Sequence, residues 1–400
     1  MPDRQSLCNS GSAVGDRGFQ ARPPTGIERA FRLTCQRYQL VVPDLPDLSE
    51  YLPLLEEIGA SGRYTNFGPL NGRLERELRA AYGAADETCV ACSSATAGLS
   101  AALLASGKSG CVLLPAFTFP ASLGAIRAAG MTPVVVDVNP HNWGLDTAQL
   151  ERAFAQTDAR LVMLVTPFGI RRDWQAELAV CRKWGAVAVI DNASGLGVAR
   201  RTEDFDENVF EVFSMHATKP FAVGEGGVVF AHHRHERALR AALNFALDSY
   251  TQPAGPSWGF NGKLSEFHAA IGIAQLRRFA DALKRRQACA AMYHSRLSGY
   301  PELIYPDEVG ASPWQSFPVL LPNGTLAERF VDCAAAVGIE IRRYYRPSLS
   351  CWPQTRCFGP CPVAEDLADR MCVLPVRAGG EVNELHDLVF KSLDRALARC

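Results

Sequence analysis

A lysine directly after an apolar run is the first residue whose type and position suggest chemistry. Val209–Ser214 has the character of a buried strand, and Met215-His216-Ala217-Thr218-Lys219 follows it, with Gly224-Glu225-Gly226-Gly227 close behind. Loss of water around an amine lowers its pKa and makes the neutral form available as a nucleophile. Lys219 is therefore a candidate nucleophile. The alternative is a surface lysine whose ammonium only reaches the rim of the fold.

An aspartate ends another apolar run. Ala186–Ile190 is followed by Asp191 and then by the small residues Asn192-Ala193-Ser194-Gly195. In an open α/β sheet, ligands bind at the carboxyl ends of the strands, so an acid at this point is directed towards a site. The alternative is an acidic cap for the segment that follows.

A turn of small residues lies between an apolar run and a helical pattern. The run Cys89–Cys92 leads into Ser93-Ser94-Ala95-Thr96-Ala97-Gly98. The N-terminus of a helix carries partial positive charge and free N–H groups, so such a turn suits a phosphate. An ordinary Ser/Thr helix cap is the competing interpretation.

Together these three features predict a site for pyridoxal phosphate. The aldehyde of this cofactor condenses with a lysine amine, its ring nitrogen needs an anionic partner, and its phosphate needs N–H donors. Phe119, shortly after the apolar run Cys111–Leu114, is placed to stack on the ring. Packing in the core is the alternative role for this side chain.

Short apolar runs that alternate with helical patterns must position these residues. Runs that are apolar throughout are typical of strands buried on both faces, as in a mostly parallel sheet with helices around it. We therefore expect an α/β fold. The expected strands are Cys111–Leu114, Pro133–Asp137, Leu161–Val165, Ala186–Asp191, Val209–Ser214 and Gly227–Ala231, and the helices between the earlier ones are Ala95–Ser106, Ala121–Ala129, Asp146–Ala155 and Trp174–Trp184.

The remaining patterns predict three parts of the chain. Residues 1–42 form an N-terminal arm without sustained periodicity, which we expect to be flexible. Residues 43–285 form the large domain, which includes the start of a long helix over Leu264–Leu297. Residues 286–400 form a smaller α+β domain with strands at Phe317–Leu321 and Ile339–Arg343.

The composition excludes several classes of protein. Of the 400 residues, 48% are hydrophobic and 21% are charged, which is the balance of a soluble globular protein and not of a disordered chain. Lys and Arg number 41 against 42 Asp and Glu, so the formal net charge is −1. This balance argues against a dedicated nucleic-acid or membrane-surface binder.

The cysteines and the hydropathy indicate a cytoplasmic protein. No stretch approaches the roughly 20 consecutive apolar residues of a membrane span, and the first residues lack the apolar region of a secretory signal. The 13 cysteines favour free thiols in a reducing compartment. Cys89-x-x-Cys92 has no second pair to complete a zinc site, so we expect no metal.

Ten short stretches, spread over roughly residues 45–398, match known motifs in one order. They are Thr65-Asn66-Phe67-Gly68-Pro69-Leu70, Ser94 to Leu99, Pro115 to Ala121, Pro133 to Val138, Ile190 to Ala193, Phe213 to Lys219, Gly224 to Gly227, Phe260 to Glu266, Pro362 to Glu365 and Val373 to Pro375. In these stretches and in their order the chain resembles the DegT/DnrJ/EryC1/StrS family of sugar aminotransferases, a branch of the fold-type I pyridoxal-phosphate enzymes. Many motifs in register are far more specific than any one of them.

The resemblance implies roles for individual residues. Lys219 corresponds to the lysine that forms a Schiff base with the cofactor, Asp191 to the partner of the ring nitrogen, and Phe119 to the stacking aromatic. The phosphate-binding positions correspond to Ala95, Thr96, Ala97 and Ser214. Asn261 and Lys263 lie where family members reach the phosphate of a neighbouring subunit, so the resemblance also implies a homodimer with shared active sites.

The sequence departs from the family at three places. Ser194 stands where the family usually has Gln or His beside the phenolic oxygen of the ring, and a serine is shorter. Thr166-Pro167-Phe168-Gly169 replaces a more usual His-x-x-Gly, and Ser350 replaces a His that many sugar enzymes carry. These differences leave the cofactor site intact in outline and put the nucleotide-sugar substrate in doubt.

The resemblance implies an aminotransferase. Lys219 would move a proton between substrate and cofactor carbons as general base and acid. The amino donor would be glutamate, and the acceptor a keto nucleotide sugar in amino-sugar or secondary-metabolite biosynthesis. The alternatives are a pyridoxal-phosphate enzyme of another type, catalysing elimination or carbon–carbon chemistry on a small amino acid, and a regulatory protein that binds the cofactor without turnover.

Overall fold

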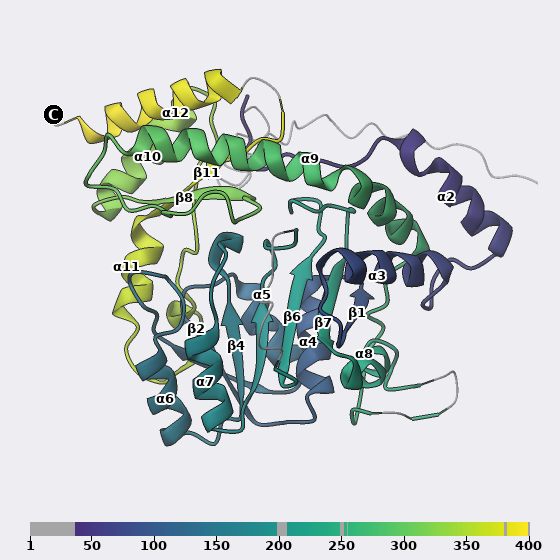
Figure 1. Cartoon of the computed structure of the whole chain (residues 1–400). Coiled ribbons are helices and arrows are strands. Elements are labelled where there is room, and N and C mark those ends of the chain that lie inside the picture. Colours follow the sequence, from purple (N-terminus) through teal and green to yellow (C-terminus); the bar gives the residue numbers. More distant parts are fainter. Residues whose placement is uncertain (1–36, 198–205, 249–251, 254, 380–381, 399–400) are drawn as a thin grey trace, which may run out of the picture. The chain divides into compact units, whose positions relative to one another are not determined.

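The computed structural model describes residues 37–197, 206–248, 252–253, 255–379 and 382–398 (Figure 1). Most of the expected N-terminal arm, residues 1–36, lies outside the described residues. Of its last residues, Tyr38 forms a β-bridge with Ile339, and Leu40 is fully buried. The packed part of the chain therefore begins before residue 43.

A large sheet carries the centre of the fold, and it confirms the prediction of an α/β protein. In the described chain its strands lie in the order β1-β7-β6-β5-β4-β2-β3-β10. β7 runs antiparallel to β1 and β6, and the other neighbouring pairs are parallel. The strands are β1 (Glu87–Cys92), β2 (Cys111–Pro115), β3 (Thr132–Val136), β4 (Leu161–Val165), β5 (Val187–Asp191), β6 (Val209–Ser214), β7 (Gly227–His232) and β10 (Arg356–Cys357).

Helices cover both faces of this sheet. Successive residues of a strand point to opposite faces, so each strand contributes side chains to the packing on both sides. On one face Val212 packs in a cluster with α4 (Ala95–Ala105), α5 (Pro120–Ala128) and α8 (Glu236–Ala242). On the other face, Phe213 and Phe230 pack with α2 (Leu48–Ser61), α3 (Pro69–Tyr82) and the first part of α9 (Glu266–Leu297). Further along that face, α6 (Thr147–Gln156) and α7 (Gln175–Lys183) cover β2 to β5. The strands are apolar throughout for this reason.

A smaller antiparallel sheet follows α9. Its strands β8 (Ser316–Leu320), β11 (Met371–Pro375) and β9 (Arg342–Arg343) lie in that order. They share a hydrophobic cluster with the end of α9, α10 (Gly324–Ala336) and α12 (Val382–Leu397). The remaining elements are α11 (Pro362–Arg370) and the 3-10 turns η2 (Pro167–Gly169), η3 (His233–His235) and η4 (Leu349–Cys351). We keep the division into domains 43–285 and 286–400 as a proposal.

Some boundaries differ from the sequence-based expectation. The strand expected over Ile339–Arg343 contains only Arg342–Arg343, and patterning predicts neither α8 nor β10. The reason is length, since a strand of two residues or a helix of two turns shows too little periodicity to recognise. Within the described ranges, no helix combines the length and apolar character that a membrane span requires.

Two buried carboxylates bind the starts of two helices. Glu266 accepts hydrogen bonds from the backbone N–H groups of Leu70 (2.8 Å) and Asn71 (2.9 Å), at the start of α3. Asp137 does the same for Val363 (3.1 Å) and Ala364 (2.9 Å), at the start of α11. Each acid satisfies donors that a helix N-terminus leaves free and joins segments distant in sequence.

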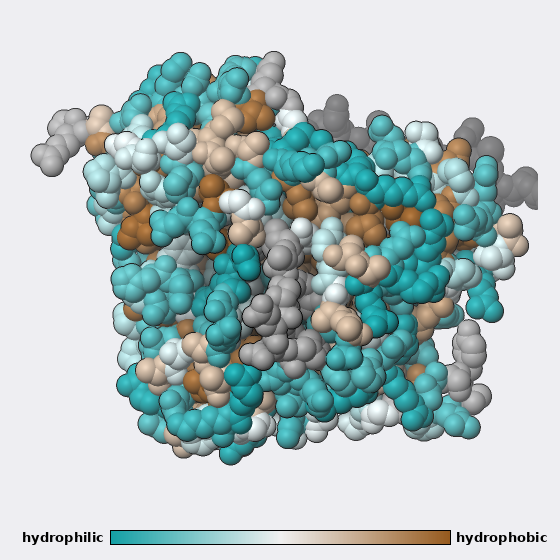
Figure 2. Space-filling model, viewed as in Figure 1, coloured by the Kyte–Doolittle hydropathy of each residue, from teal (hydrophilic) through white to brown (hydrophobic). Residues whose placement is uncertain are grey.

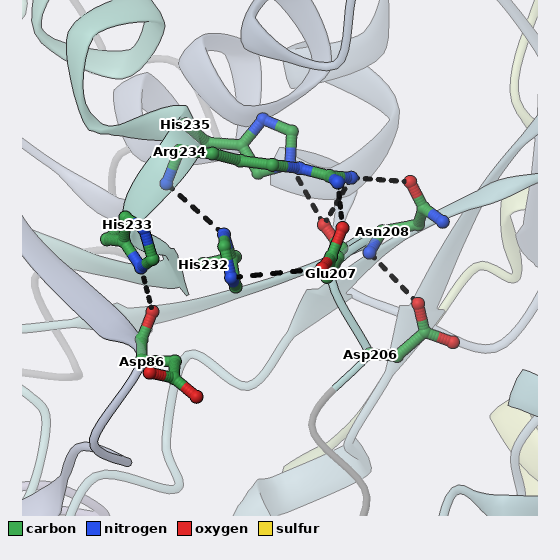
Figure 3. A network of polar contacts seen from close by, with 8 residues as sticks. All are labelled: Asp86, Asp206, Glu207, Asn208, His232, His233, Arg234 and His235. Carbon is green, nitrogen blue, oxygen red and sulfur yellow. Dashed lines mark hydrogen bonds and ion pairs between the residues drawn. The ribbon is translucent and has the colours of Figure 1, made fainter.

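A polar network fixes the turn between β7 and α8 (Figure 3). Arg234 forms an ion pair with Glu207 and donates to the Asn208 side chain (3.0 Å). His233 lies against the Asp86 carbonyl oxygen, at 3.1 Å from its Nδ1. These contacts join the ends of β1, β6 and β7, away from the carboxyl ends of the parallel strands. The molecular face in Figure 2 is mostly hydrophilic, with smaller hydrophobic areas between.

Candidate active site

The carboxyl ends of parallel strands bring the predicted residues to one edge of the large sheet. β1, β2, β5 and β6 share one direction, since β1 and β6 are both antiparallel to β7. Ser94 follows β1, Phe119 follows β2, Asp191 ends β5, and Lys219 follows β6. The edge is where ligands bind in open α/β folds.

The amine of Lys219 lies in a small polar cluster. Its Nζ donates to Ser194 Oγ (3.1 Å) and to Gln315 Oε1 (3.0 Å). The backbone holds it there, because Lys219 N donates to the His216 carbonyl (2.8 Å) and Ala217 N to the Gly224 carbonyl (2.7 Å). Burial lowers the pKa of Lys219 to about 8, although the Asp191 carboxylate acts in the opposite direction.

This lowered pKa predicts how the lysine responds to pH. The ammonium form has no lone pair, so the nucleophile appears as pH rises through the pKa. In the cofactor-free chain we expect acylation of Lys219, followed by peptide mapping, to reach half its plateau near pH 8. A lysine in a model peptide reaches this point near pH 10.4. A midpoint for Lys219 at that higher pH would contradict the prediction.

Asp191 is buried and hydrogen-bonded at both carboxylate oxygens. Ser122 Oγ donates to its Oδ2 (2.6 Å), and the Ala193 backbone N–H donates to its Oδ1 (3.2 Å). Burial raises the pKa of Asp191, while the Ser122 hydrogen bond and the charge of Lys219 oppose this rise. Ser122 lies in the first turn of α5, and sequence reasoning did not identify it. Its signal would have been its position just after Phe119-Pro120 at the start of a helix.

The start of α4 offers donors for an anion. Ser94 caps the helix, and its Oγ accepts from the Ala97 backbone N–H (3.1 Å). Ala95, Thr96 and Ala97 form the first turn, and Thr96 is exposed. Gly227, at the start of β7, lies so close that an added Cβ would stand 2.6 Å from the Ala95 backbone nitrogen. The first turn of α4 therefore fits a phosphate group in charge and shape.

Substitution of Gly227 tests this cradle. In Gly227→Ala the new methyl group must displace the first turn of α4, and overpacking of this kind costs about 1–3 kcal/mol. We expect the dissociation constant of the cofactor to rise by about 5- to 100-fold, measured by fluorescence titration of the cofactor-free chain. Gly124→Ala in α5 is the matched control, because a Cβ there meets nothing within 4 Å. Equal binding by both variants would contradict the assignment of the cradle.

The other predicted residues differ in how close they lie to this cluster. Ser214 N donates to the Ala193 carbonyl (3.1 Å), and Ser214 Oγ accepts from His216 N (3.2 Å), which ties β6 to the Asp191 loop.

Phe119 precedes α5, and its side chain is 56% exposed, so core packing does not explain its position. A half-buried Tyr345 ring stacks on Phe168, with centroids 5.2 Å apart and planes at 5°.

Asn261 and Lys263 are not brought into contact with Lys219 or Asp191. Lys263 Nζ donates to Asn244 Oδ1 (2.9 Å) and lies 4.9 Å from the centre of the Phe245 ring. Its backbone forms a bridge with Cys92, just before the start of α4. Asn261 is exposed and pairs with Asn244 in a second bridge.

Gln315 is a second site residue, besides Ser122, that sequence reasoning missed. It directly precedes β8 of the small sheet and accepts hydrogen bonds from both Lys219 and Ser194 (2.6 Å). Its neighbours in sequence give no chemical signal, and only the tertiary fold brings it to Lys219, 96 residues earlier.

A cavity of about 400 Å³ lies elsewhere, and none of the residues of the Lys219 cluster lines it. Its lining includes Phe67, Asn244 and three arginines. Arg234 is paired with Glu207, Arg237 with Asp248, and Arg240 with Glu75 and Glu236. Because acids neutralise these arginines, the cavity is a poor site for an anion.

Comparisons with known proteins find two similar transaminases. The dTDP-4-amino-4,6-dideoxy-D-glucose transaminase of Shigella dysenteriae is 28% identical over 349 residues, which cover 84% of this chain and 93% of that protein. The enzyme of the same name from Escherichia coli is 26% identical, over 84% and 92%.

Solved structures share the whole fold. The structure of DesI, determined in the presence of its TDP-sugar product, matches with a TM-score of 0.80 and 27% identity, covering 91% of this chain and 95% of DesI. A proposed PLP-dependent aminotransferase from Bacillus cereus ATCC 10987 matches with a TM-score of 0.81 and 27% identity, over 89% and 99%.

The model of one family matches residues 48–391, which is most of the chain. The protein is an aminotransferase, and its cofactor is pyridoxal phosphate. It belongs to the DegT/DnrJ/EryC1/StrS aminotransferase family.

Proposed function

We propose that this aminotransferase moves an amino group from glutamate to a keto nucleotide sugar, with Lys219 and Asp191 as its catalytic residues. The observation that carries the proposal is the shared buried cluster at the carboxyl ends of β5 and β6. There a lysine with a lowered pKa and a carboxylate influence each other's ionisation. Such pairs of perturbed groups are typical of active sites.

The residues present fit pyridoxal phosphate, which supplies an electron sink for electrons released at a substrate carbon. Lys219 would bond to its aldehyde carbon, and the Asp191 carboxylate would hold the proton on its ring nitrogen. The first turn of α4 (Ala95, Thr96, Ala97) and Ser214 would hold the phosphate. Phe119 would cover one face of the ring. Ser194 would lie beside Lys219, from which it accepts a hydrogen bond.

The released Lys219 amine would then take and return a proton at Nζ. A pKa near 8 suits this task, because both the neutral and the charged form are accessible close to neutral pH. The hydrogen bond from Ser122 opposes the rise in the pKa of Asp191 that burial causes, and so favours its anionic form. Each residue thus holds a charge or a proton where the reaction needs it.

The substrate class is proposed from the relatives. The two transaminases carry a dTDP-amino sugar in their names, and the DesI structure was determined with a TDP-sugar product. Elimination chemistry or a regulatory role finds no support among these relatives. The differences at Ser194, Thr166 and Ser350 from the usual family residues are the proposed source of selectivity among sugars. Ser194 contacts the Lys219 amine, Ser350 donates to Glu365 Oε1 (2.8 Å), and Thr166 directly precedes η2.

A homodimer with shared sites and a cytoplasmic location complete the proposal. Support for the dimer comes from large exposed side chains, among them Tyr64, Phe245, Trp258 and Phe267. Asn261 and Lys263 would reach the partner's phosphate, consistent with their lack of contact with the cluster in their own chain. Free thiols in the described part of the chain, Cys89 and Cys361 among them, support a reducing compartment.

The test is amination of a defined substrate. Purified protein with pyridoxal phosphate and glutamate is incubated with a panel of 3-keto and 4-keto nucleotide sugars, and products are identified by mass spectrometry. We expect one keto sugar to be aminated and 2-oxoglutarate to appear in equal amount. Reactions without glutamate, and reactions with Lys219→Ala, are the controls. Consumption of glutamate without any aminated sugar would refute the substrate class and leave the cofactor chemistry standing.

A further inference from the structure

Gln315 completes a triangle of hydrogen bonds around the Lys219 amine. Lys219 Nζ donates to Gln315 Oε1 (3.0 Å) and to Ser194 Oγ (3.1 Å), and Ser194 Oγ donates to the same Gln315 oxygen (2.6 Å). The amide oxygen therefore accepts from both partners. Lys219 and Ser194 come from the edge of the large sheet, whereas Gln315 comes from the small sheet.

The backbone before Gln315 is held in an unusual conformation. Trp314 is fully buried with a φ of 52°, a value that non-glycine residues rarely adopt. Its Nε1 donates to the Val309 carbonyl (2.6 Å), and its own carbonyl accepts from Arg286 Nη1 (3.3 Å). Such a conformation persists only where the surroundings determine it, and these positions gather at functional sites.

The backbone after Gln315 is fixed as well. Ser316 begins β8 and pairs with Pro375 of β11. Gln315 is thus placed between an anchored tryptophan and the first residue of a strand, which fixes its backbone, and the two hydrogen bonds at Oε1 hold its side chain against Lys219 and Ser194. This rigidity distinguishes it from a glutamine that meets a lysine by chance on a surface.

The glutamine oxygen has a property that other acceptors lack. An amide remains an uncharged acceptor at every pH in the working range, whereas a carboxylate or imidazole titrates. A carbonyl oxygen stabilises an ammonium more than a neutral amine, because hydrogen bonds to charged donors are stronger. The charged or titratable groups that face Lys219 are Asp191 from β5 and, beyond it, the buried Tyr345 hydroxyl. Gln315 can therefore hold the amine without adding a charge.

We propose that Gln315 is the positioning residue of Lys219, which, with Ser194, holds the amine in place whenever it is not bonded to the cofactor. The proposal rests on the proposed role of Lys219. Ser194 contributes by donating its proton to Gln315, which leaves the serine oxygen free to accept from Lys219. The shorter serine at position 194 gives Gln315 room to reach the lysine.

The experiment measures Lys219 without the cofactor. Acylation of the cofactor-free full-length chain is followed across pH by peptide mapping, for wild type, Gln315→Leu and Gln315→Glu. Loss of the acceptor favours the neutral amine, so we expect the midpoint of the Leu variant to fall by about one pH unit. A nearby carboxylate favours the ammonium, so the midpoint of the Glu variant should rise by about one unit or more.

A matched control separates positioning from general packing. Gln287 lies on α9 and donates to the Gly310 carbonyl (2.9 Å), in the segment that leads to Gln315, and it has no bond with Lys219. Gln287→Leu should keep the wild-type midpoint. In the loaded enzyme, Gln315→Leu should lower kcat by about 10-fold and change KM for glutamate little.

Each possible result of the acylation experiment either supports or overturns the proposal. Opposite shifts in the Leu and Glu variants support the proposal, and the Glu variant alone decides the matter if Gln315→Leu does not fold. Wild-type midpoints in folded variants would overturn it. Failure of the proposed function is recognised separately, because the midpoint of Lys219 acylation requires neither cofactor nor substrate.

Discussion

Replacing Lys219 with alanine is expected to lower kcat by at least about 10⁴-fold. The variant loses the amine that bonds to the cofactor and also the group that carries the proton. The substitution removes the donor to Ser194 and Gln315, but these two remain paired with each other at 2.6 Å. The folded structure should therefore survive, and a steady-state assay of the variant loaded with cofactor measures the loss of chemistry alone.

Lys284→Ala is the matched control for this experiment. Lys284 lies on α9 with its side chain 78% exposed, and it pairs only loosely with Asp281 at 3.7 Å. Its loss should leave kcat unchanged. If Lys219→Ala retained more than a few per cent of wild-type activity, the assignment of the catalytic lysine would be wrong.

The second large effect is expected at Asp191. Asp191→Asn keeps the shape of the side chain and an acceptor for Ser122, but it removes the negative charge that would hold a proton on the ring nitrogen. Loss of such a preorganised charge costs about 10²- to 10³-fold in kcat. The cofactor should also dissociate faster, which dialysis followed by absorbance measures.

Stability distinguishes this effect from a folding defect. Asp191→Asn removes the cost of a buried charge, but its single amide oxygen can accept from only one of the two donors, Ser122 and Ala193. These effects oppose each other, so we expect the free energy of unfolding to change by no more than about 1–3 kcal/mol. In Asp191→Ala the Ala193 backbone N–H loses its acceptor and the Ser122 hydroxyl keeps only the Thr118 hydroxyl (3.0 Å), so we expect a cost of about 1–3 kcal/mol. A denaturant titration of both variants separates the two contributions. Wild-type rates in Asp191→Asn would remove the carboxylate from the mechanism.

The local sequence pattern was sufficient to predict the positions of Lys219, Asp191 and the first turn of α4 in the fold. Lys219 and Asp191 directly follow or end apolar strands, and the small residues from Ser94 begin a helix. In a parallel sheet each strand end reaches the same edge, so the sequence predicts their proximity without knowledge of the strand order. Their catalytic roles remain proposals.

The direction of a strand, and contacts between residues distant in sequence, could not be predicted in this way. The apolar run of β7 reads like those of its neighbours, yet β7 runs antiparallel, because a run of buried residues carries no sign of direction. Ser122 and Gln315 were missed for a related reason. Their side chains reach Asp191 and Lys219 only through tertiary contacts with partners 69 and 96 residues away in sequence.

Short elements were the other source of error. β10 pairs two residues with β3, and Tyr38 pairs with Ile339 through a single bridge. Neither is long enough to show the alternation that marks a strand. The longer periodic elements agree with prediction to within a few residues, as for α4 and α6.

Chemical reduction gives the most direct test of the bond assigned to Lys219. The purified protein is loaded with pyridoxal phosphate, treated with borohydride, digested and mapped by mass spectrometry. The reduced cofactor is expected on the peptide that contains Lys219 and on no other. Modification of another lysine such as Lys263, or of none, would contradict the assignment of this active site.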